Sequence, residues 1–263
     1  MIKHAINDEF LDVDFPSQPQ FVFGDRGKLP FQEAGPCFED IYANYTDKEI
    51  EEAIEQQDSI GGHLDLLVTR IYDQKQEGSC VGNATCQAIE IVLNRQHGPD
   101  RVVHLSAISL YKQIGTSPNS GAYVSDGWKA IHSTGVLPLD NEENRARFKH
   151  VMPNTGFHLP YPAGWKETAA LFRGLEYTPI NTLQGLKTAS VKGFPIVVGR
   201  EGHSIPYVRL MFDSRGNLVF KYPNSWGNWG DNGYGYDTIS QIRKAASYAF
   251  AVRSVSPTYL QTF

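Results

Sequence analysis

The periodicity of apolar residues changes along this chain, and the change constrains the fold more than any other feature. In the first part the clear signals are helical, and they predict helices over residues 80–95, 106–114, 126–133 and 183–190. The later part is β-rich, with predicted strands at 195–200, 207–213, 218–221 and 249–254 and a hairpin turn at 214–217. This order predicts an α+β fold in which a helical lobe and an antiparallel β-rich lobe meet at a cleft.

Composition excludes several classes of partner. The 263 residues can bury a large core, as one domain or two lobes, and their net charge of −5 argues against a nucleic-acid partner. No apolar run reaches the ~18 residues of a membrane helix and no secretory signal is visible, so no membrane partner is expected. The three cysteines, Cys37, Cys80 and Cys86, predict a reducing compartment such as the cytoplasm rather than a disulfide framework.

One cysteine stands where the backbone favours a reactive thiol. Cys80 follows Gly78-Ser79 at the start of the strongest predicted helix. The unpaired N–H groups and the positive end of the helix dipole lie there, and both stabilise a thiolate. Cys86, further along the same helix, and Cys37 have no such setting and are expected to pack as inert thiols.

Three other polar residues complete a set that can perform acyl transfer. His203 follows an apolar strand, and Asn224 follows another strand and can accept the histidine N–H, fixing the ring tautomer. Trp226 could shield that hydrogen bond from water. With Gln74 as an oxyanion donor, Cys80 as nucleophile and His203 as acid/base, the set suffices for a thioester mechanism. Each residue alone has an ordinary structural interpretation, but their joint occurrence favours the chemistry.

The sequence around these residues resembles the papain-like cysteine peptidases, in the bacterial and viral branch that lacks disulfides. Asp73-Gln74 leads to Gly78-Ser79-Cys80, and Gly202-His203-Ser204 matches the family's histidine block. Residues 224–235 match the Asn-Ser-Trp-Gly block and its glycine-rich continuation almost whole. His203 and Asn224 lie 123 and 144 residues after Cys80, close to the ~130–150 typical of the family. The resemblance covers roughly residues 64–255.

The resemblance implies a papain-like two-lobed fold and a cysteine endopeptidase acting on a polypeptide, with neither a metal nor an organic cofactor. It makes Cys80 the nucleophile, His203 the acid/base, Asn224 its orienter and Gln74 the oxyanion residue. It also implies substrate contacts at Gly121, Ala122, Glu201, Gly202 and Trp226.

Three departures from the family pattern affect the site. Glu77 stands where secreted relatives carry a disulfide cysteine, which fits an intracellular enzyme and places a carboxylate near the cleft. Val81 replaces the aromatic residue that usually follows the nucleophile. Glu201, two residues before the histidine, is expected to line the pocket for the second residue before the cleaved bond, and predicts a preference for basic or polar side chains there.

The region before the peptidase domain has two open interpretations. Residues 1–63 form an N-terminal extension, and 64–263 the papain-like domain. A capping box at Thr46–Glu49 predicts a short helix, preceded by a Phe-rich stretch that is expected to lie extended on the body. The extension is either an inhibitory segment, such as a propeptide, lying over the cleft, or a structural arm or docking piece for a larger assembly.

Two other functions compete with peptide hydrolysis. One is a papain-fold structural or binding module of a larger assembly, including a virion; the intact set of four site residues argues against it. The other is a related acyl transfer such as deamidation or isopeptide hydrolysis. The long Asn-Ser-Trp-Gly block favours the peptidase branch.

Overall fold

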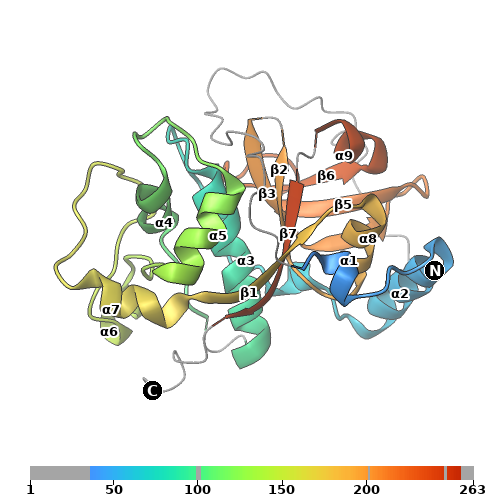
Figure 1. Cartoon of the computed structure of the whole chain (residues 1–263), viewed down its shortest axis with the longest axis horizontal. Coiled ribbons are helices and arrows are strands. Elements are labelled where there is room, and N and C mark those ends of the chain that lie inside the picture. Colours follow the sequence, from blue (N-terminus) through green and yellow to red (C-terminus); the bar gives the residue numbers. More distant parts are fainter. Residues whose placement is uncertain (1–35, 99–101, 201, 246–247, 256–263) are drawn as a thin grey trace.

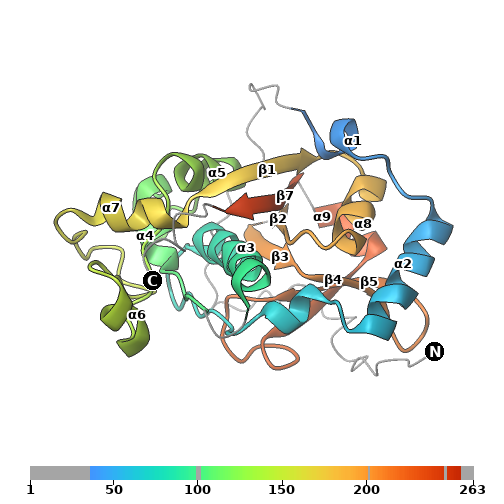
Figure 2. The ribbon, with the colours of Figure 1, turned by 90° about the horizontal axis from the view of Figure 1, so that it is seen from below.

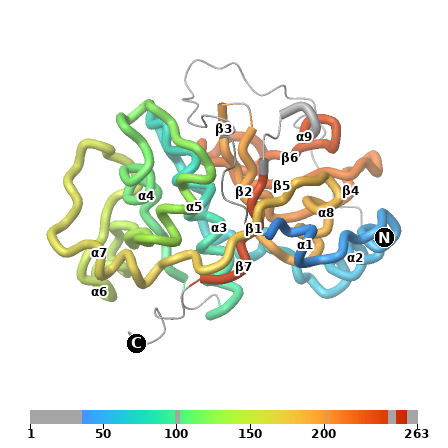
Figure 3. Tube along the Cα trace, viewed as in Figure 1, coloured from blue at the N-terminus to red at the C-terminus, as the bar shows by residue number. Residues whose placement is uncertain are grey.

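The computed structural model describes residues 36–98, 102–200, 202–245 and 248–255, and within them the chain forms two lobes (Figure 1). The helical lobe lies on one side, and the β-rich lobe with its own helices lies on the other (Figure 3). The elements of the helical lobe are α3 (Cys80–His97), α4 (Ala107–Ile114), α5 (Val124–Ser133), α6 (Glu142–Arg147), α7 (Trp165–Ala169) and the 3-10 turn η4 (Ala170–Phe172). The predicted α+β two-lobed fold is confirmed.

The β-rich lobe contains two antiparallel sheets. The first has the strand order β1-β7-β2-β3 and the second has the order β4-β5-β6. The strands are β1 (Gly174–Ile180), β2 (Ile196–Arg200), β3 (His203–Tyr207), β4 (Arg209–Phe212), β5 (Leu218–Pro223), β6 (Tyr234–Thr238) and β7 (Tyr248–Val255). Around them lie α1 (Phe38–Ile41), α2 (Asp47–Ile60), the 3-10 turn η2 (Leu64–Leu67), α8 (Leu183–Val191) and α9 (Ile239–Ala245).

Helix α3 lies between the two lobes. Every residue from Cys80 to Asn94 is buried, as expected of a helix that is covered on all sides. It packs against α4 and α5 on one side and against β3 and β7 on the other, an arrangement that Figure 2 shows from below. The first residue of α3 is therefore held by both lobes at once.

The predicted strand over residues 207–213 is divided between the two sheets. Tyr207 ends β3, where it pairs with Ile196 of β2, whereas Arg209 begins β4 and pairs with Lys221 of β5. Between them the N–H of Val208 donates to Lys221 O at 3.0 Å, so the chain passes from one sheet directly to the next. The predicted hairpin at 214–217 is present between β4 and β5. The sequence pattern does not predict β1, β6 or the part of β3 that precedes Tyr207.

The described part of the N-terminal extension packs into the β-rich lobe. Phe38, Ile50 and Ile54 are buried in the same apolar cluster as residues of α8, β2 and β5. A short helix, α1, begins after Cys37, where an extended chain was expected; the Asp40 carboxylate accepts from the Cys37 N–H at 2.9 Å and so caps it. The predicted capping box of α2 is present, with the N–H of Glu49 donating to Thr46 Oγ1. Residues 1–35, with most of the Phe-rich stretch, lie outside the described residues.

Two isoleucines of α2 test whether this helix is part of the lobe's core. Ile54→Ala should lower the free energy of unfolding by about 2–5 kcal/mol, because Ile54 is only 2% exposed and a cavity would remain. Ile60→Ala, with Ile60 70% exposed, should change it by less than about 0.5 kcal/mol. Urea unfolding of both variants measures the difference, and equal effects would contradict the packing of α2.

Candidate active site

Cys80 is the first residue of α3. Ser79 precedes it as the N-cap residue, and Asn83 Nδ2 donates to Ser79 O at 2.9 Å and to Ser79 Oγ at 3.0 Å. These bonds fix the entry of the chain into the helix. The sulfur therefore lies at the positive end of the helix dipole, as predicted, where a thiolate is stabilised.

The segment before Cys80 is hydrogen-bonded to the asparagine block from the other half of the chain. Asp73 and Trp226 form an antiparallel bridge. The N–H of Gln74 donates to Ser225 O at 2.8 Å, and the N–H of Gly227 donates to Tyr72 O at 3.0 Å. Backbone pairing thus brings Gln74 next to the residue that follows Asn224.

The side chain of Gln74 is oriented by two hydrogen bonds. Ser225 Oγ donates to Gln74 Oε1 at 2.5 Å, and Gln74 Nε2 donates to Glu77 O at 2.8 Å. Because the Glu77 carbonyl can only accept, the second bond identifies the NH₂ end of the amide, and the Ser225 hydroxyl therefore donates to the carbonyl end. Sequence reasoning overlooked Ser225, although it lies inside the matched block.

His203 and Asn224 form the hydrogen bond that the sequence predicts. His203 Nε2 lies 2.9 Å from Asn224 Oδ1, and the N–H of Ser225 donates to the same oxygen at 2.8 Å. Because that backbone N–H can only donate, the atom it contacts is the amide oxygen, and Nε2 must carry the proton of a neutral ring. The basic nitrogen of His203 is then Nδ1.

Trp226 covers this hydrogen bond. Its ring stacks on His203 with 4.6 Å between centroids and 25° between planes. His203 has no exposed surface and Asn224 is 1% exposed. The tryptophan therefore fixes the imidazole plane and excludes water from it, as its place in the sequence suggested.

Burial sets the charge of His203 in this arrangement. Loss of solvation lowers the pKa of His203 to about 3, against the opposing effect of the Asn224 hydrogen bond and with a smaller contribution from the charge of Arg200. The ring is therefore neutral near pH 7 while the site is covered. Cys80 also has no exposed surface, so its sulfur is covered in this conformation.

A buried ion pair lies behind the histidine strand. Arg200, at the end of β2, donates to both carboxylate oxygens of Asp237 on β6, at 2.8 and 2.7 Å. The Tyr207 hydroxyl, at the end of β3, donates to the same carboxylate at 2.6 Å. These bonds connect the two sheets and hold β2 and β3, and hence His203, against β6.

The residues expected to contact substrate lie in two places. Gly121 lies close to Gly78, because a Cβ added to Gly78 would be 3.2 Å from the Gly121 nitrogen. The N–H of Gly121 donates to the Tyr111 hydroxyl at 3.0 Å. Ala122 next to it is buried in the core of the helical lobe. Gly202 has a φ of +73° in the tight connection between β2 and β3. Glu201 lies outside the described residues, so its role stays a prediction.

The other two cysteines differ from Cys80 in their surroundings. Cys86 is fully buried inside α3, and burial raises its pKa well above the usual range. The Cys37 thiol donates to Asp40 at 3.0 Å, and this hydrogen bond raises the pKa of Cys37. All three cysteines are free of disulfide bonds.

Neither a metal site nor a membrane span is seen in the described part of the chain. No group of three or more His, Cys, Asp or Glu side chains is arranged there to hold a metal ion. None of the helices described has both the length and the apolar character needed to cross a bilayer.

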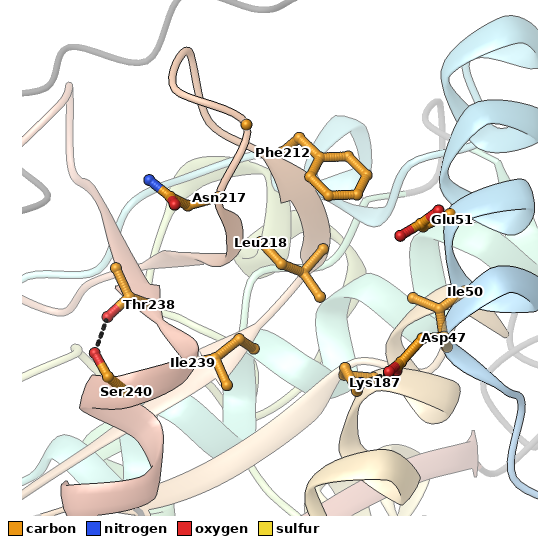
Figure 4. Close-up of a pocket in the computed structure, with 11 residues that line it drawn as sticks. Asp47, Ile50, Glu51, Lys187, Phe212, Asn217, Leu218, Thr238, Ile239 and Ser240 are labelled. Carbon is orange, nitrogen blue, oxygen red and sulfur yellow. Dashed lines mark hydrogen bonds and ion pairs between the residues drawn. The ribbon is translucent and has the colours of Figure 1, made fainter.

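A separate groove of about 630 Å³ lies away from these residues (Figure 4). It opens between α2, α8, the β4–β5 hairpin and the start of α9. Lys187 and Asp47 form an ion pair at its side, and Ile50, Phe212 and Leu218 contribute apolar surface. None of the predicted site residues lines it.

The comparisons with known proteins agree with this geometry at the level of the fold. Neither a protein-family model nor a curated protein sequence matches the chain. Among solved structures, it is similar to xylellain, a cysteine protease from Xylella fastidiosa, with a TM-score of 0.58 and 20% identity over 89% of this chain and 98% of the other. A procathepsin B from Trypanosoma congolense has a TM-score of 0.54 and 13% identity over 81% of this chain and 82% of the other.

A third similar structure is a digestive procathepsin L2 from the midgut of Tenebrio molitor larvae, with a TM-score of 0.57 and 16% identity over 71% of this chain and 65% of the other. These likenesses have low sequence identity, and what they establish is the architecture. The chain has the papain-like fold, with a helical lobe and a β-rich lobe.

The burial of His203 predicts a specific pH dependence of stability. Its pKa is about 3 in the folded chain and ordinarily 6.5, so between these values the unfolded chain binds more protons. This histidine should therefore reduce the free energy of unfolding progressively as the pH falls below 6.5. Glu90, whose burial raises its pKa to about 7, acts in the opposite direction.

Comparison with His203→Phe separates the two effects, because the variant keeps Glu90 and a flat ring beneath Trp226. Urea unfolding at pH 7, 5 and 4 should show a stability difference between wild type and variant that shifts in favour of the variant as the pH falls. A difference that is constant with pH would contradict the neutral, buried imidazole.

Proposed function

We propose that this chain is a papain-like cysteine peptidase that hydrolyses peptide bonds through a thioester formed on Cys80. The main support for the proposal is the hydrogen bond from His203 Nε2 to Asn224 Oδ1. Asn224 belongs to the asparagine block, whose backbone pairs with the Gln74 segment. A turn asparagine and a strand histidine with only structural roles would not require that hydrogen bond. The papain-like fold of the chain supports the same assignment.

The first half of the reaction forms the acyl-enzyme. The Cys80 thiol transfers its proton to His203 Nδ1, and its sulfur attacks the carbonyl carbon of the scissile peptide bond. The resulting oxyanion accepts hydrogen bonds from the backbone N–H of Cys80 and the side-chain amide of Gln74. His203 then gives the proton to the leaving amine, the C–N bond breaks, and a thioester remains on Cys80.

The second half regenerates the thiol. A water molecule transfers a proton to His203 Nδ1 and attacks the thioester carbonyl, again with the oxyanion held by Gln74 and the helix N-terminus. The C–S bond breaks, the carboxylic acid product leaves, and the proton returns to the sulfur. Asn224 keeps the imidazole plane fixed through both steps, because its amide oxygen holds Nε2–H.

The substrate in this proposal is a polypeptide bound in extended form between the two lobes, near Gly121 and Gly202. Glu201 contributes the preference for basic or polar side chains that the sequence predicts. Neither a metal nor an organic cofactor takes part in any step.

Thiol-directed labelling tests the proposal. An epoxide-type inhibitor, followed by peptide mapping, should modify Cys80 and leave Cys37 and Cys86 unmodified, because Cys80 alone of the three has a histidine partner in this mechanism and the pKa of each of the other two is raised. His203→Ala should abolish labelling, and Cys80→Ala should abolish hydrolysis of a denatured protein substrate. Cys37→Ala serves as the matched control and should retain both. Labelling of Cys37 in preference to Cys80, or hydrolysis by Cys80→Ala, would contradict the proposal.

A further inference from the structure

Glu77 connects the loop before the nucleophile to a distant loop of the helical lobe. Its Oε1 accepts hydrogen bonds from the backbone N–H groups of Gly156 at 2.8 Å and Phe157 at 2.9 Å. Oε2 is buried and has no hydrogen-bond partner in the described ranges. Two successive N–H groups form a natural cradle for an anion, and bonds to a charged acceptor are roughly twice as strong as neutral ones.

The loop that contains Gly156 and Phe157 is itself hydrogen-bonded to neighbouring elements. Ser106 Oγ donates to Pro153 O at 2.6 Å, and the N–H of Ala107 donates to Asn154 Oδ1 at 3.1 Å, which ties the loop to the start of α4. Asn154 Nδ2 lies 3.3 Å from Asn83 Oδ1, on the first turn of α3. Glu77 is therefore bound to a part of the helical lobe that also contacts α3. We call its two hydrogen bonds from the Gly156 and Phe157 N–H groups the Glu77 clamp.

The clamp acts on Gln74 through the main chain of Glu77. The N–H of Glu77 donates to Gln74 O at 3.1 Å, and Gln74 Nε2 donates back to Glu77 O at 2.8 Å. The position of the Glu77 backbone therefore sets the direction of the Gln74 amide. Ser225 holds the other end of that amide.

We infer that Glu77 is a positioning residue for the reaction, holding Gln74 in the geometry that stabilises the oxyanion. This inference rests on the proposed peptidase function. The carboxylate stands at the position where the resemblance places a disulfide cysteine in secreted relatives, and it joins the nucleophile loop to a neighbouring loop without an oxidised bond. The attachment is therefore independent of the redox state of the surroundings.

Three variants test the inference. Glu77→Ala removes the clamp, and its kcat for a peptide substrate should fall on the order of 10²-fold, with KM nearly unchanged, because the oxyanion donor is misplaced. Alkylation of Cys80 by iodoacetamide needs no oxyanion donor and should change less than about threefold, since the fall in kcat comes from donor geometry. Glu77→Gln keeps a side-chain oxygen as acceptor and should recover most of the activity. Glu167→Ala, at an exposed site on α7, is the matched control and should behave as wild type.

The outcomes separate this inference from the proposed function. Equal kcat in Glu77→Ala and wild type, equal losses in Glu77→Ala and Glu77→Gln, or a parallel fall of kcat and alkylation would each overturn the positioning role. Amide hydrogen exchange at Gly156 and Phe157 provides a readout that needs no activity: protection should be lost in Glu77→Ala and kept in Glu77→Gln. A wild type without hydrolysis contradicts the proposed function, and unchanged exchange in Glu77→Ala contradicts the clamp itself.

Discussion

The site depends on the backbone pairing between the Gln74 segment and the asparagine block. Asp73 and Trp226 are far apart in the sequence, yet they form one antiparallel bridge, flanked by bonds from Gln74 N and Gly227 N. This short ladder fixes the loop that leads into Cys80 against the segment that carries Asn224. The ladder thus adds a second connection between the two lobes to the packing of α3 against β3.

Burial of the histidine has two opposing consequences. Trp226 and the surrounding core exclude water from the His203–Asn224 hydrogen bond, which strengthens it and fixes the ring. The same loss of solvation lowers the pKa of His203 to about 3, so the covered ring is neutral. A charged ring needs a thiolate opposite it or contact with solvent. The neutral ring is already in the tautomer whose Nδ1 can accept a proton.

The features predicted from the sequence are mostly local. Helix α3 was predicted because its apolar residues recur at helical spacing, and the hairpin between β4 and β5 because its turn residues are adjacent. The two-lobed order followed from the change in periodicity. Strand β1 has no alternating pattern, because the successive residues Leu175 and Glu176 are both exposed. The change of sheet at Val208 has no sequence signal, so the pattern predicts one continuous strand at 207–213.

The long-range contacts of the site could not be predicted from the sequence. The partners of Glu77 lie 79 and 80 residues away, at backbone N–H groups that carry no residue-specific signal. The Arg200–Asp237 pair behind β3 likewise depends on two strands from different sheets. The roles of Cys80, His203, Asn224 and Gln74 were predicted because the motifs around them are specific, and the structure supplies the Ser225 and Glu77 bonds that orient Gln74.

In the proposed reaction His203, oriented by Asn224, activates the Cys80 thiol. The pH dependence of Cys80 alkylation by iodoacetamide, in wild type and in His203→Ala, measures this activation. Wild-type Cys80 should react well below the ordinary thiol pKa of about 8.5, and the variant should react only as the pH approaches that value. Identical profiles in the two proteins, both following an ordinary thiol, would contradict this activation.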